Sequence, residues 1–238
     1  MSSSMPSVRS VAQMLFRQKE PRPLPNKPTN ETATMRRSPQ QARGQQRVGL
    51  ILDTAEQLFA ERGYDAASTN ELAAQAGIPI GSVYQFFPNK EAILHALLAR
   101  YRQELAALYA ERPTPAGEPL ADALARVLDV LTSYGGDHAG FSRMVLQAPA
   151  GSALATACSD LANDIMARID AVLAAHAPAL RAEQRRLFTS VGFTAVGAIL
   201  SQALSAKQAG DIDAGHALIE QATTLLVGYL GAALGRAR

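Results

Sequence analysis

The chain has 238 residues, with 23 Lys or Arg against 21 Asp or Glu, and aromatic residues make up only 5% of it. This length suits one large domain or two small ones, and the composition predicts an interior packed with Ala and Leu. The one cysteine, Cys158, excludes an internal disulfide and fits a reducing compartment. We find neither a fully apolar run of 18 residues nor an N-terminal secretory segment, so we expect a cytoplasmic protein with no membrane partner.

Charge is distributed unevenly along the chain. Residues 1–48 carry a net charge of +7, which leaves −5 for the remaining 190 residues. Residues 1–42 also hold six of the 13 prolines, so we expect a disordered basic extension there. The positive charge of this extension fits binding to a polyanionic partner, and it fits equally a disordered tail that is only solvated. Within it, the spacing from Val8 to Phe16 fits a transit peptide or a transient helix, and Met35 begins a segment that looks like a protein start.

Apolar residues then recur at three- and four-residue spacing, which predicts amphipathic helices. Gly63 and Gly77 are expected to end two of them, and Ser68 or Thr69 and then Asn89 to cap the helices that follow. The helices predicted in the first half of the chain cover residues 44–63, 69–77, 79–87 and 89–111.

The second half of the chain continues in the same way. Gly135-Gly136, Pro149, Pro178 and Gly210 are expected to separate helices. These helices are predicted at about 118–134, 140–147, 152–177, 180–207 and 212–235. No segment shows the two-residue alternation of a strand, so the fold class is all-α.

Two helices of about two turns lie between Thr69 and Phe87, joined by Gly77-Ile78-Pro79. This arrangement is typical of a helix-turn-helix, whose second helix enters the major groove of DNA. We expect Ile78 and Val83 to point into the core. Helical hairpins with a glycine turn also occur in proteins that never touch DNA.

The stretch TAEQLFAERGYDAASTNELAAQAGIPIGSVYQFFPNKEAIL, Thr54 to Leu94, resembles the N-terminal domain of the TetR family of transcriptional regulators. The likeness includes LFAERGY, the S-x-x-E-L-A-x-x-A-G helix and the G-S-V-Y-x-x-F-x-x-K-E helix. It implies a three-helix helix-turn-helix domain over residues 43–92 and a larger helical ligand-binding and dimerisation domain over 93–238. The implied function is a DNA-binding repressor that holds a palindromic operator as a dimer and is released by a small-molecule effector.

The resemblance also implies which residues contact DNA. Hydroxyls and a cation near helix N-termini suit phosphate oxygens, and the amide of Gln85 can pair bidentately with adenine. Ile80 is often polar in relatives, and Phe86 often stands as a Tyr or His that reaches a phosphate. Tyr84 and Phe86 are alternatively core aromatics, and Lys90 a solvated charge. The DNA-binding candidates are Arg43, Arg47, Thr69, Ile80, Gly81, Ser82, Tyr84, Gln85, Phe86 and Lys90.

The helices at 180–207 and 212–235 are apolar or small on nearly every side, which a single solvent-facing helix cannot tolerate. We therefore predict that they form a homodimer interface, with a monomeric core as the alternative. A pocket for an apolar or aromatic effector is predicted ahead of them, although residues of these types are more often plain core. The pocket candidates are Leu98, Tyr101, Leu105, His138, Phe141, Met144, Gln147, Ile165, Arg168 and Phe188.

Other chemistry is weakly indicated. The four histidines share no metal-binding spacing, Cys158 has no C-x-x-C partner, and no phosphate or dinucleotide loop is present. We expect no cofactor, no metal and no enzyme activity. A helical adaptor that binds protein and an all-α enzyme stay open as alternatives, and a steep salt dependence of binding distinguishes DNA from an apolar protein partner.

Overall fold

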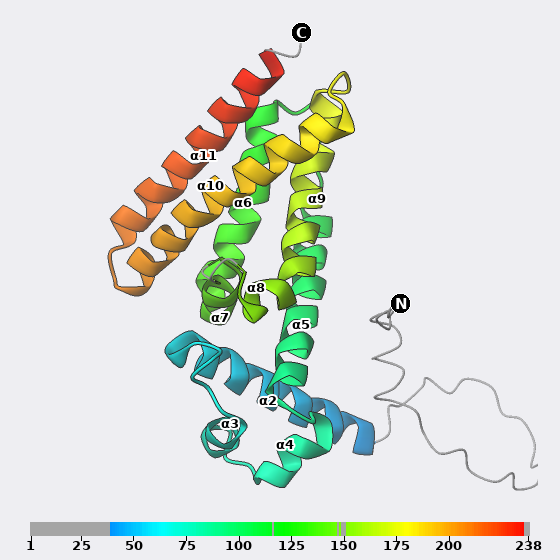
Figure 1. The fold of residues 1–238 in the computed structure, drawn as a ribbon, viewed down its shortest axis with the longest axis vertical. Helices are drawn as coiled ribbons and strands as arrows, with labels where there is room; N and C mark the ends of the chain where they lie inside the picture. Colours follow the sequence, from blue (N-terminus) through cyan, green and yellow to red (C-terminus); the bar gives the residue numbers. More distant parts are fainter. Residues whose placement is uncertain (1–38, 116, 147, 149–150, 236–238) are drawn as a thin grey trace, which may run out of the picture. The chain divides into compact units, whose positions relative to one another are not determined.

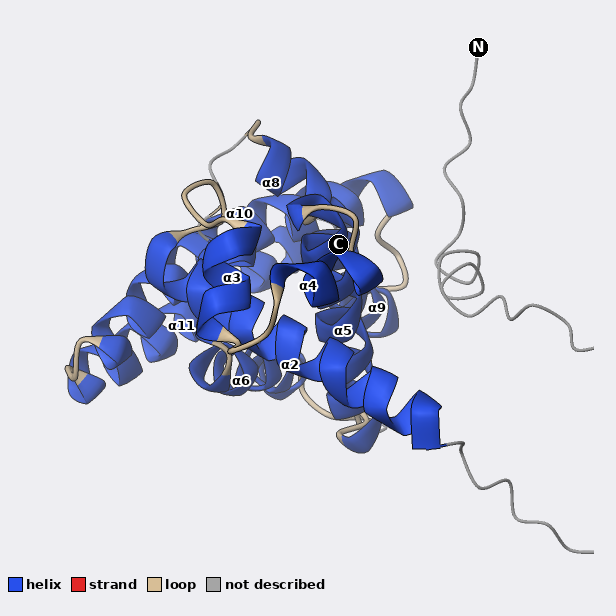
Figure 2. Cartoon of the chain, turned by 90° about the horizontal axis from the view of Figure 1, so that it is seen from below, coloured by secondary structure: helices blue, strands red, loops and turns tan. Residues whose placement is uncertain are grey.

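The computed structural model describes residues 39–115, 117–146, 148 and 151–235, and every regular element in these ranges is helical. The all-α prediction is confirmed (Figures 1 and 2). Most of the predicted extension, residues 1–38 with Val8, Phe16 and Met35, lies outside the described residues. The elements are α2 (Pro39–Arg62), α3 (Thr69–Gln75), α4 (Ile80–Phe86), α5 (Lys90–Glu111), α6 (Leu120–Asp137), α7 (Ala139–Phe141), the π-helical turn η1 (Ser142–Leu146), α8 (Ala153–Ala157), α9 (Ser159–His176), α10 (Ala182–Gln208) and α11 (Ile212–Gly235).

The first three helices pack as a small unit at one end of the molecule, with α3 and α4 foremost in Figure 2. The helix predicted from Gly44 starts earlier, at Pro39, because proline is tolerated in a first helical turn. Gly63, at φ +82°, follows its end. Ser68 rather than Thr69 caps α3: its Oγ accepts from the Glu71 N–H, and the Glu71 carboxylate accepts from the Ser68 N–H. The Glu71 carboxylate also accepts from the Ser68 hydroxyl at 2.9 Å, and this bond, with the one from the Ser68 N–H, holds the pKa of Glu71 below its usual value.

The long helix α5 belongs to both parts of the chain. Its first turns place Ile93 and Leu97 in the core beneath α2, and later turns place Tyr101 and Leu105 among the helices that follow. The predicted domain boundary at residues 92–93 therefore falls inside one continuous helix. Any tilt of α5 is shared by both parts.

The remaining helices form the larger part, in which α10 and α11 lie side by side as an antiparallel pair against α6 and α9 (Figure 1). Gly135-Gly136, predicted to end a helix, lies inside α6 instead. A Cβ on Gly135 would come within 2.9 Å of Leu204 Cδ1 and 3.0 Å of Ser142 Oγ. This glycine therefore serves close helix packing and does not mark a break.

Two other predicted helices are divided. The segment 140–147 consists of α7 and the π-helical turn η1, and 152–177 is interrupted at Cys158 between α8 and α9. The Cys158 thiol is buried and donates to the Met144 carbonyl at 3.5 Å. Burial raises its pKa to about 11, which keeps the thiol protonated and unreactive at neutral pH.

His176, at the end of α9, links this helix to the segment just before α6. Its Nδ1–H donates to the Val172 carbonyl at 2.8 Å and its Nε2–H to the Glu118 carbonyl at 2.7 Å. Only the imidazolium can donate from both nitrogens. These two bonds raise the pKa of His176.

The helix α10 is apolar over most of its length, as predicted. Ala182–Lys207 has a stretch of mean hydropathy 1.6 and is, by length and composition alone, able to cross a membrane, with 33% of that stretch buried. We predicted no such span because we found no fully apolar run of 18 residues in the sequence. In the structure α10 packs along α11.

Candidate nucleic-acid interface and apolar crevice

The geometry of the helix-turn-helix is set by a short apolar core. Leu72, Ile78 and Val83 are each 8% exposed or less, and they hold α3 against α4. Gly77 adopts φ +64°, a left-handed conformation that glycine tolerates best, and the Ile78 N–H then donates to the Ala73 carbonyl at 3.0 Å. The predicted turn is therefore confirmed in position and in its inward residues.

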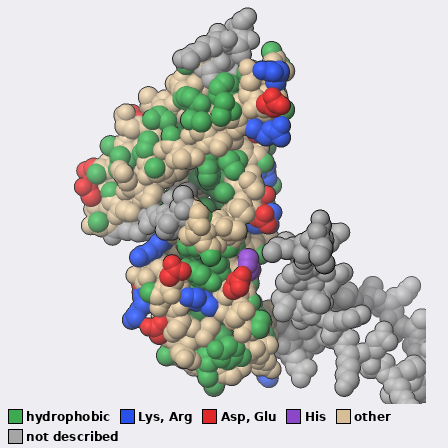
Figure 3. All heavy atoms as spheres, viewed as in Figure 1, with side chains coloured by type: hydrophobic (Ala, Val, Ile, Leu, Met, Phe, Trp, Pro, Cys, Tyr) green, Lys and Arg blue, Asp and Glu red, His purple; other side chains and the backbone are tan. Residues whose placement is uncertain are grey.

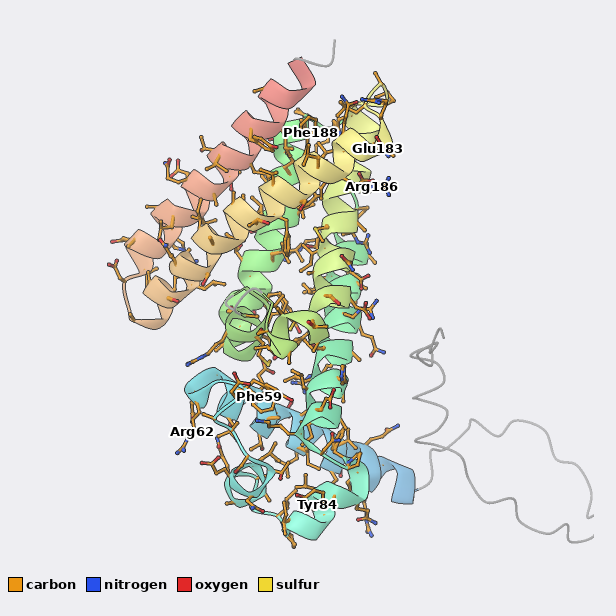
Figure 4. All side chains as sticks on the ribbon, in the orientation of Figure 1. Phe59, Arg62, Tyr84, Glu183, Arg186 and Phe188 are labelled. Carbon is orange, nitrogen blue, oxygen red and sulfur yellow. The ribbon has the colours of Figure 1, made fainter. Side chains whose placement is uncertain are left out.

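One face of α4 is left in solvent. Tyr84 is 51% exposed, and Gly81 and Gln85 are exposed with it. Figure 4 labels Tyr84 on α4, at the end of the molecule remote from α10 and α11. Its hydroxyl lies 3.2 Å from Thr69 Oγ1, so two predicted phosphate ligands from different helices meet at one point.

The other candidates on these helices are more enclosed. Ile80 and Phe86 are half-buried and pack against the core, and Ser82 is half-buried as well. Phe86 therefore fits the alternative of a core aromatic, and its contact with DNA stays a prediction. Arg43 is exposed and Arg47 half-buried, and because they are four residues apart in α2 they share one face of it.

Lys90 has a role that the sequence did not indicate. Its ammonium donates to the carbonyls of Tyr64, Asp65 and Ala67 at 2.7, 3.1 and 2.9 Å, and it lies 4.5 Å from the centre of the Tyr64 ring. An ammonium has three N–H donors, and all three are engaged. The predicted phosphate contact would require Lys90 to give up one of these bonds.

A polar network joins α2 to the larger part of the chain. Glu56 of α2 accepts from Arg100 Nη2 at 2.8 Å, and its other oxygen lies 2.9 Å from His138 Nδ1. Arg143 Nη1 donates to the Ala60 carbonyl near the end of α2 at 2.7 Å. A Cβ on Gly140 would come within 2.9 Å of the Glu56 backbone oxygen. Of these residues only His138 was a candidate, because charges on helix faces carry no sequence signal for such long-range contacts.

The predicted pocket residues mostly lie in the core. Six of them, Leu98, Tyr101, Leu105, Phe141, Met144 and Ile165, are 4% exposed or less, whereas Arg168 is exposed and Gln147 lies outside the described residues.

Aromatic rings fill the space around Tyr101. It makes edge contacts with Tyr134, His138 and Phe141 at centroid distances of 5.6 to 6.0 Å. Burial raises the pKa of its hydroxyl, as does the nearby Glu56 carboxylate. Phe188 contacts Tyr229 of α11 edge-on, with ring centroids 6.1 Å apart, and Figure 4 labels it near the start of α10.

An apolar crevice lies elsewhere, between α6, α9, α10 and α11. Its cavity volume is about 20 Å³, which is room for one water-sized group. Figure 3 shows hydrophobic side chains gathered on the surface of the larger part. Ile165 is the one predicted pocket residue that lines this crevice. The full lining is Leu128, Leu131, Ile165, Ile169, Gly192, Phe193, Val196, Gly197, Leu200 and Leu226.

No metal site is apparent in the described part of the chain, where no group of three His, Cys, Asp or Glu side chains could hold an ion. The two features with the geometry of a site are therefore the exposed face of α4 and the apolar crevice.

Comparison with known families gives two matches. The family model described as bacterial regulatory proteins, tetR family, matches residues 51–97, and the model described as Tetracyclin repressor-like, C-terminal domain, matches residues 119–230. The first model covers α3 and α4 entirely. The second model includes every residue that lines the crevice.

Individual relatives are similar over shorter segments. The chain is 44% identical over 52 residues to the uncharacterized HTH-type transcriptional regulator YuxN of Bacillus subtilis, covering 22% of this chain and 18% of that protein. It is 39% identical over 61 residues to the HTH-type transcriptional repressor KstR2 of Rhodococcus jostii, covering 26% and 30%. The matched segments thus span less than a third of these relatives.

Solved structures match over most of the fold. A TetR-family transcriptional regulator from Streptomyces coelicolor is 31% identical, with a TM-score of 0.57, and the match covers 78% of this chain and 98% of that one. FadR from Bacillus subtilis, solved with stearoyl-CoA, is 19% identical, with a TM-score of 0.56 over 75% of this chain and 97% of FadR. At that identity the second likeness concerns the fold alone.

Proposed function

We propose a function for this chain from the premise that it belongs to the TetR family of bacterial regulatory proteins. The function is ligand-responsive repression of transcription in the bacterial cytoplasm. A homodimer holds a palindromic operator through α3 and α4 and releases it when a small apolar effector binds. The observation that carries this proposal is the exposed face of α4, where Gly81, Tyr84 and Gln85 stand clear of the core.

Each exposed group on α4 suits a part of the DNA. The Gln85 amide can pair bidentately with adenine in the major groove. The Thr69 and Tyr84 hydroxyls, 3.2 Å apart, suit a single phosphate group. Residues 49–112 hold five Lys or Arg and eight Asp or Glu, so added positive charge has to come from Arg43 and Arg47 at the start of α2.

The dimer is supported by apolar side chains that α10 and α11 leave in solvent. Leu187, Val191 and Leu225 are 60%, 43% and 42% exposed. Exposed apolar patches of this kind mark interfaces, and a second copy would cover them by two-fold symmetry. The two copies of α4 then have to lie about 34–36 Å apart, or a multiple of this, to read one face of the DNA.

The crevice marks a gap in the packing that an effector would have to widen, and α6 connects this crevice to α2. Leu128 and Leu131 of α6 line it, and the residue that follows this helix, His138, contacts Glu56 of α2. An effector that displaces α6 would therefore shift α2 and the helices packed on it. Such coupling is typically about 1–3 kcal/mol.

The test starts from DNA selection. Random duplexes retained by the purified protein are sequenced, and we expect a motif with two-fold symmetry. Gln85→Ala should relax base preference at one position per half-site by about 1–3 kcal/mol, whereas Gln103→Ala, exposed on α5, should not. Binding that shows no symmetric motif and no steep salt dependence would favour the adaptor alternative.

A further inference from the structure

Two contacts attach the DNA-binding unit, α2 to α4, to the larger part of the chain. The first is α5, which runs through both parts and packs against α2. The second is the later half of α2, against which α7 and η1 pack (Figure 1). A single shared helix would let the unit swing about it, so the second contact decides the direction in which α4 faces. The helix α4 follows α2 because it packs on α3, and α3 packs on α2.

Glu56 is the polar centre of the second contact. Its side chain is only 13% exposed, and each carboxylate oxygen has its own partner. Oε2 accepts from Arg100 Nη2 of α5 at 2.8 Å, and Oε1 lies 2.9 Å from Nδ1 of His138, between α6 and α7. One side chain of α2 is thus held by two elements of the larger part. A carboxylate held on both oxygens cannot turn without losing a charge-assisted bond.

Arg143 and Gly140 hold the end of α2 to the same elements. Arg143 Nη1 donates to the Ala60 carbonyl at 2.7 Å and to the Glu61 carbonyl at 3.3 Å. These carbonyls belong to the last turn of α2, where a helix offers them no donor and carries partial negative charge. A Cβ on Gly140 would come within 2.9 Å of the Glu56 backbone oxygen, so the backbones of α7 and α2 are in direct contact. Flexible side chains therefore leave no slack between these two helices.

We call Glu56, Arg100, His138 and Arg143 together the α2 clamp. We propose that this clamp sets the half-site spacing that the dimer accepts on DNA. The inference rests on the proposed function, because it names the residues that adjust how the dimer reads a palindromic operator. In that dimer α10 and α11 join the two subunits, and η1, which carries Arg143, packs on α10.

The clamp acts by making a swing of α2 costly. One extra base pair between the half-sites moves one of them by about 3.4 Å along the DNA and turns it by about 35°. To follow this change, α2 has to swing over α7. Hydrogen bonds weaken steeply when they are stretched or misaligned, so the swing breaks the bonds of Glu56 and Arg143. A dimer with an intact clamp therefore reads one spacing.

The experiment measures how sharply the dimer distinguishes half-site spacings. The palindromic duplex obtained by selection is compared, by fluorescence anisotropy with the full chain, with duplexes that have one base pair more or fewer between the half-sites. We expect the parent to bind both altered duplexes at least about tenfold more weakly, because one α4 then misses its groove. Glu56→Ala and Arg143→Met should reduce this difference to about threefold or less, because the swing then breaks fewer bonds to charged groups.

The matched control is Arg112→Met. It removes a bond to Asp129 of α6 at 2.8 Å, so a charged bond is lost within the larger part and α2 is untouched. This variant should distinguish the spacings as the parent does. All variants are compared at a temperature where circular dichroism shows them folded, and a loss of stability alone weakens binding to the three duplexes alike. Arg143 is exposed, so Arg143→Met should fold and decides the question if Glu56→Ala does not.

The outcomes separate this inference from the function on which it rests. Clamp variants that distinguish the spacings like the parent overturn it, and so does an Arg112→Met variant that loses the distinction to the same extent. A parent that binds all three duplexes equally also overturns it. In each of these cases a motif with two-fold symmetry leaves the proposed function standing. If selection yields no such motif, the proposed function fails and this inference fails with it.

Discussion

Replacing Lys90 with Met tests whether this cation holds the loop after α2 or contacts a phosphate. Met keeps an apolar stem and removes the three bonds to the carbonyls of Tyr64, Asp65 and Ala67. Hydrogen bonds from a charged donor contribute about 1.5–3 kcal/mol each. Two of these three are partly buried and water can replace the third, so we expect the free energy of unfolding to fall by about 2–4 kcal/mol. For a chain of this size the melting temperature then drops by about 5–15 °C.

The assay pairs thermal unfolding, followed by circular dichroism at fixed protein concentration, with operator binding across a range of salt concentrations. At temperatures where the variant is folded, Lys90→Met should keep the parent's dependence of log K on log salt, because a lysine bonded to carbonyls releases no counterions. Arg47→Met is the matched control. It should change stability by no more than about 0.5 kcal/mol and reduce the salt slope by about one.

The opposite pattern refutes this reasoning. If Lys90→Met melts like the parent and its salt slope falls by about one, the ammonium leaves the three carbonyls on DNA binding and contacts a phosphate.

Three further outcomes follow from the packing. Gly140→Ala should destabilise the fold by about 1–3 kcal/mol, because its Cβ meets the α2 backbone, whereas Gly136→Ala, with nothing within 4 Å, should be neutral or stabilising by up to about 1 kcal/mol in urea unfolding. Because folding raises the pKa of His176, its contribution to the free energy of unfolding is complete below about pH 6.5 and is lost as pH rises through the pKa of the folded state. NMR titration of His176 measures that pKa, and the stability of His176→Gln should depend less on pH than that of the parent. Val191→Glu with Leu225→Glu should give folded monomers by light scattering that no longer bind operator, and a persistent dimer would contradict the assigned interface.

Local patterns in the sequence determined the helices and the helix-turn-helix. The apolar spacing of α2 and α5, the Ser68 and Asn89 caps before α3 and α5, and the Gly77-Ile78-Pro79 turn all act over a few residues. Such signals depend on backbone geometry and capping, which neighbours along the chain decide. The exposed positions of Tyr84 and Gln85 follow from the same period.

Tertiary structure decided the roles that depend on distant partners. The sequence did not indicate that Lys90 reaches back 23 to 26 residues to three carbonyls. We predicted that a helix ends at Gly135, but this glycine lies inside α6, where the lack of a side chain leaves room for Leu204 of α10. The predicted pocket around Tyr101 is packed with aromatic rings, whereas the crevice opens one layer away. Where a cavity remains depends on how side chains from four helices fill a shared space, and no single helix carries that information.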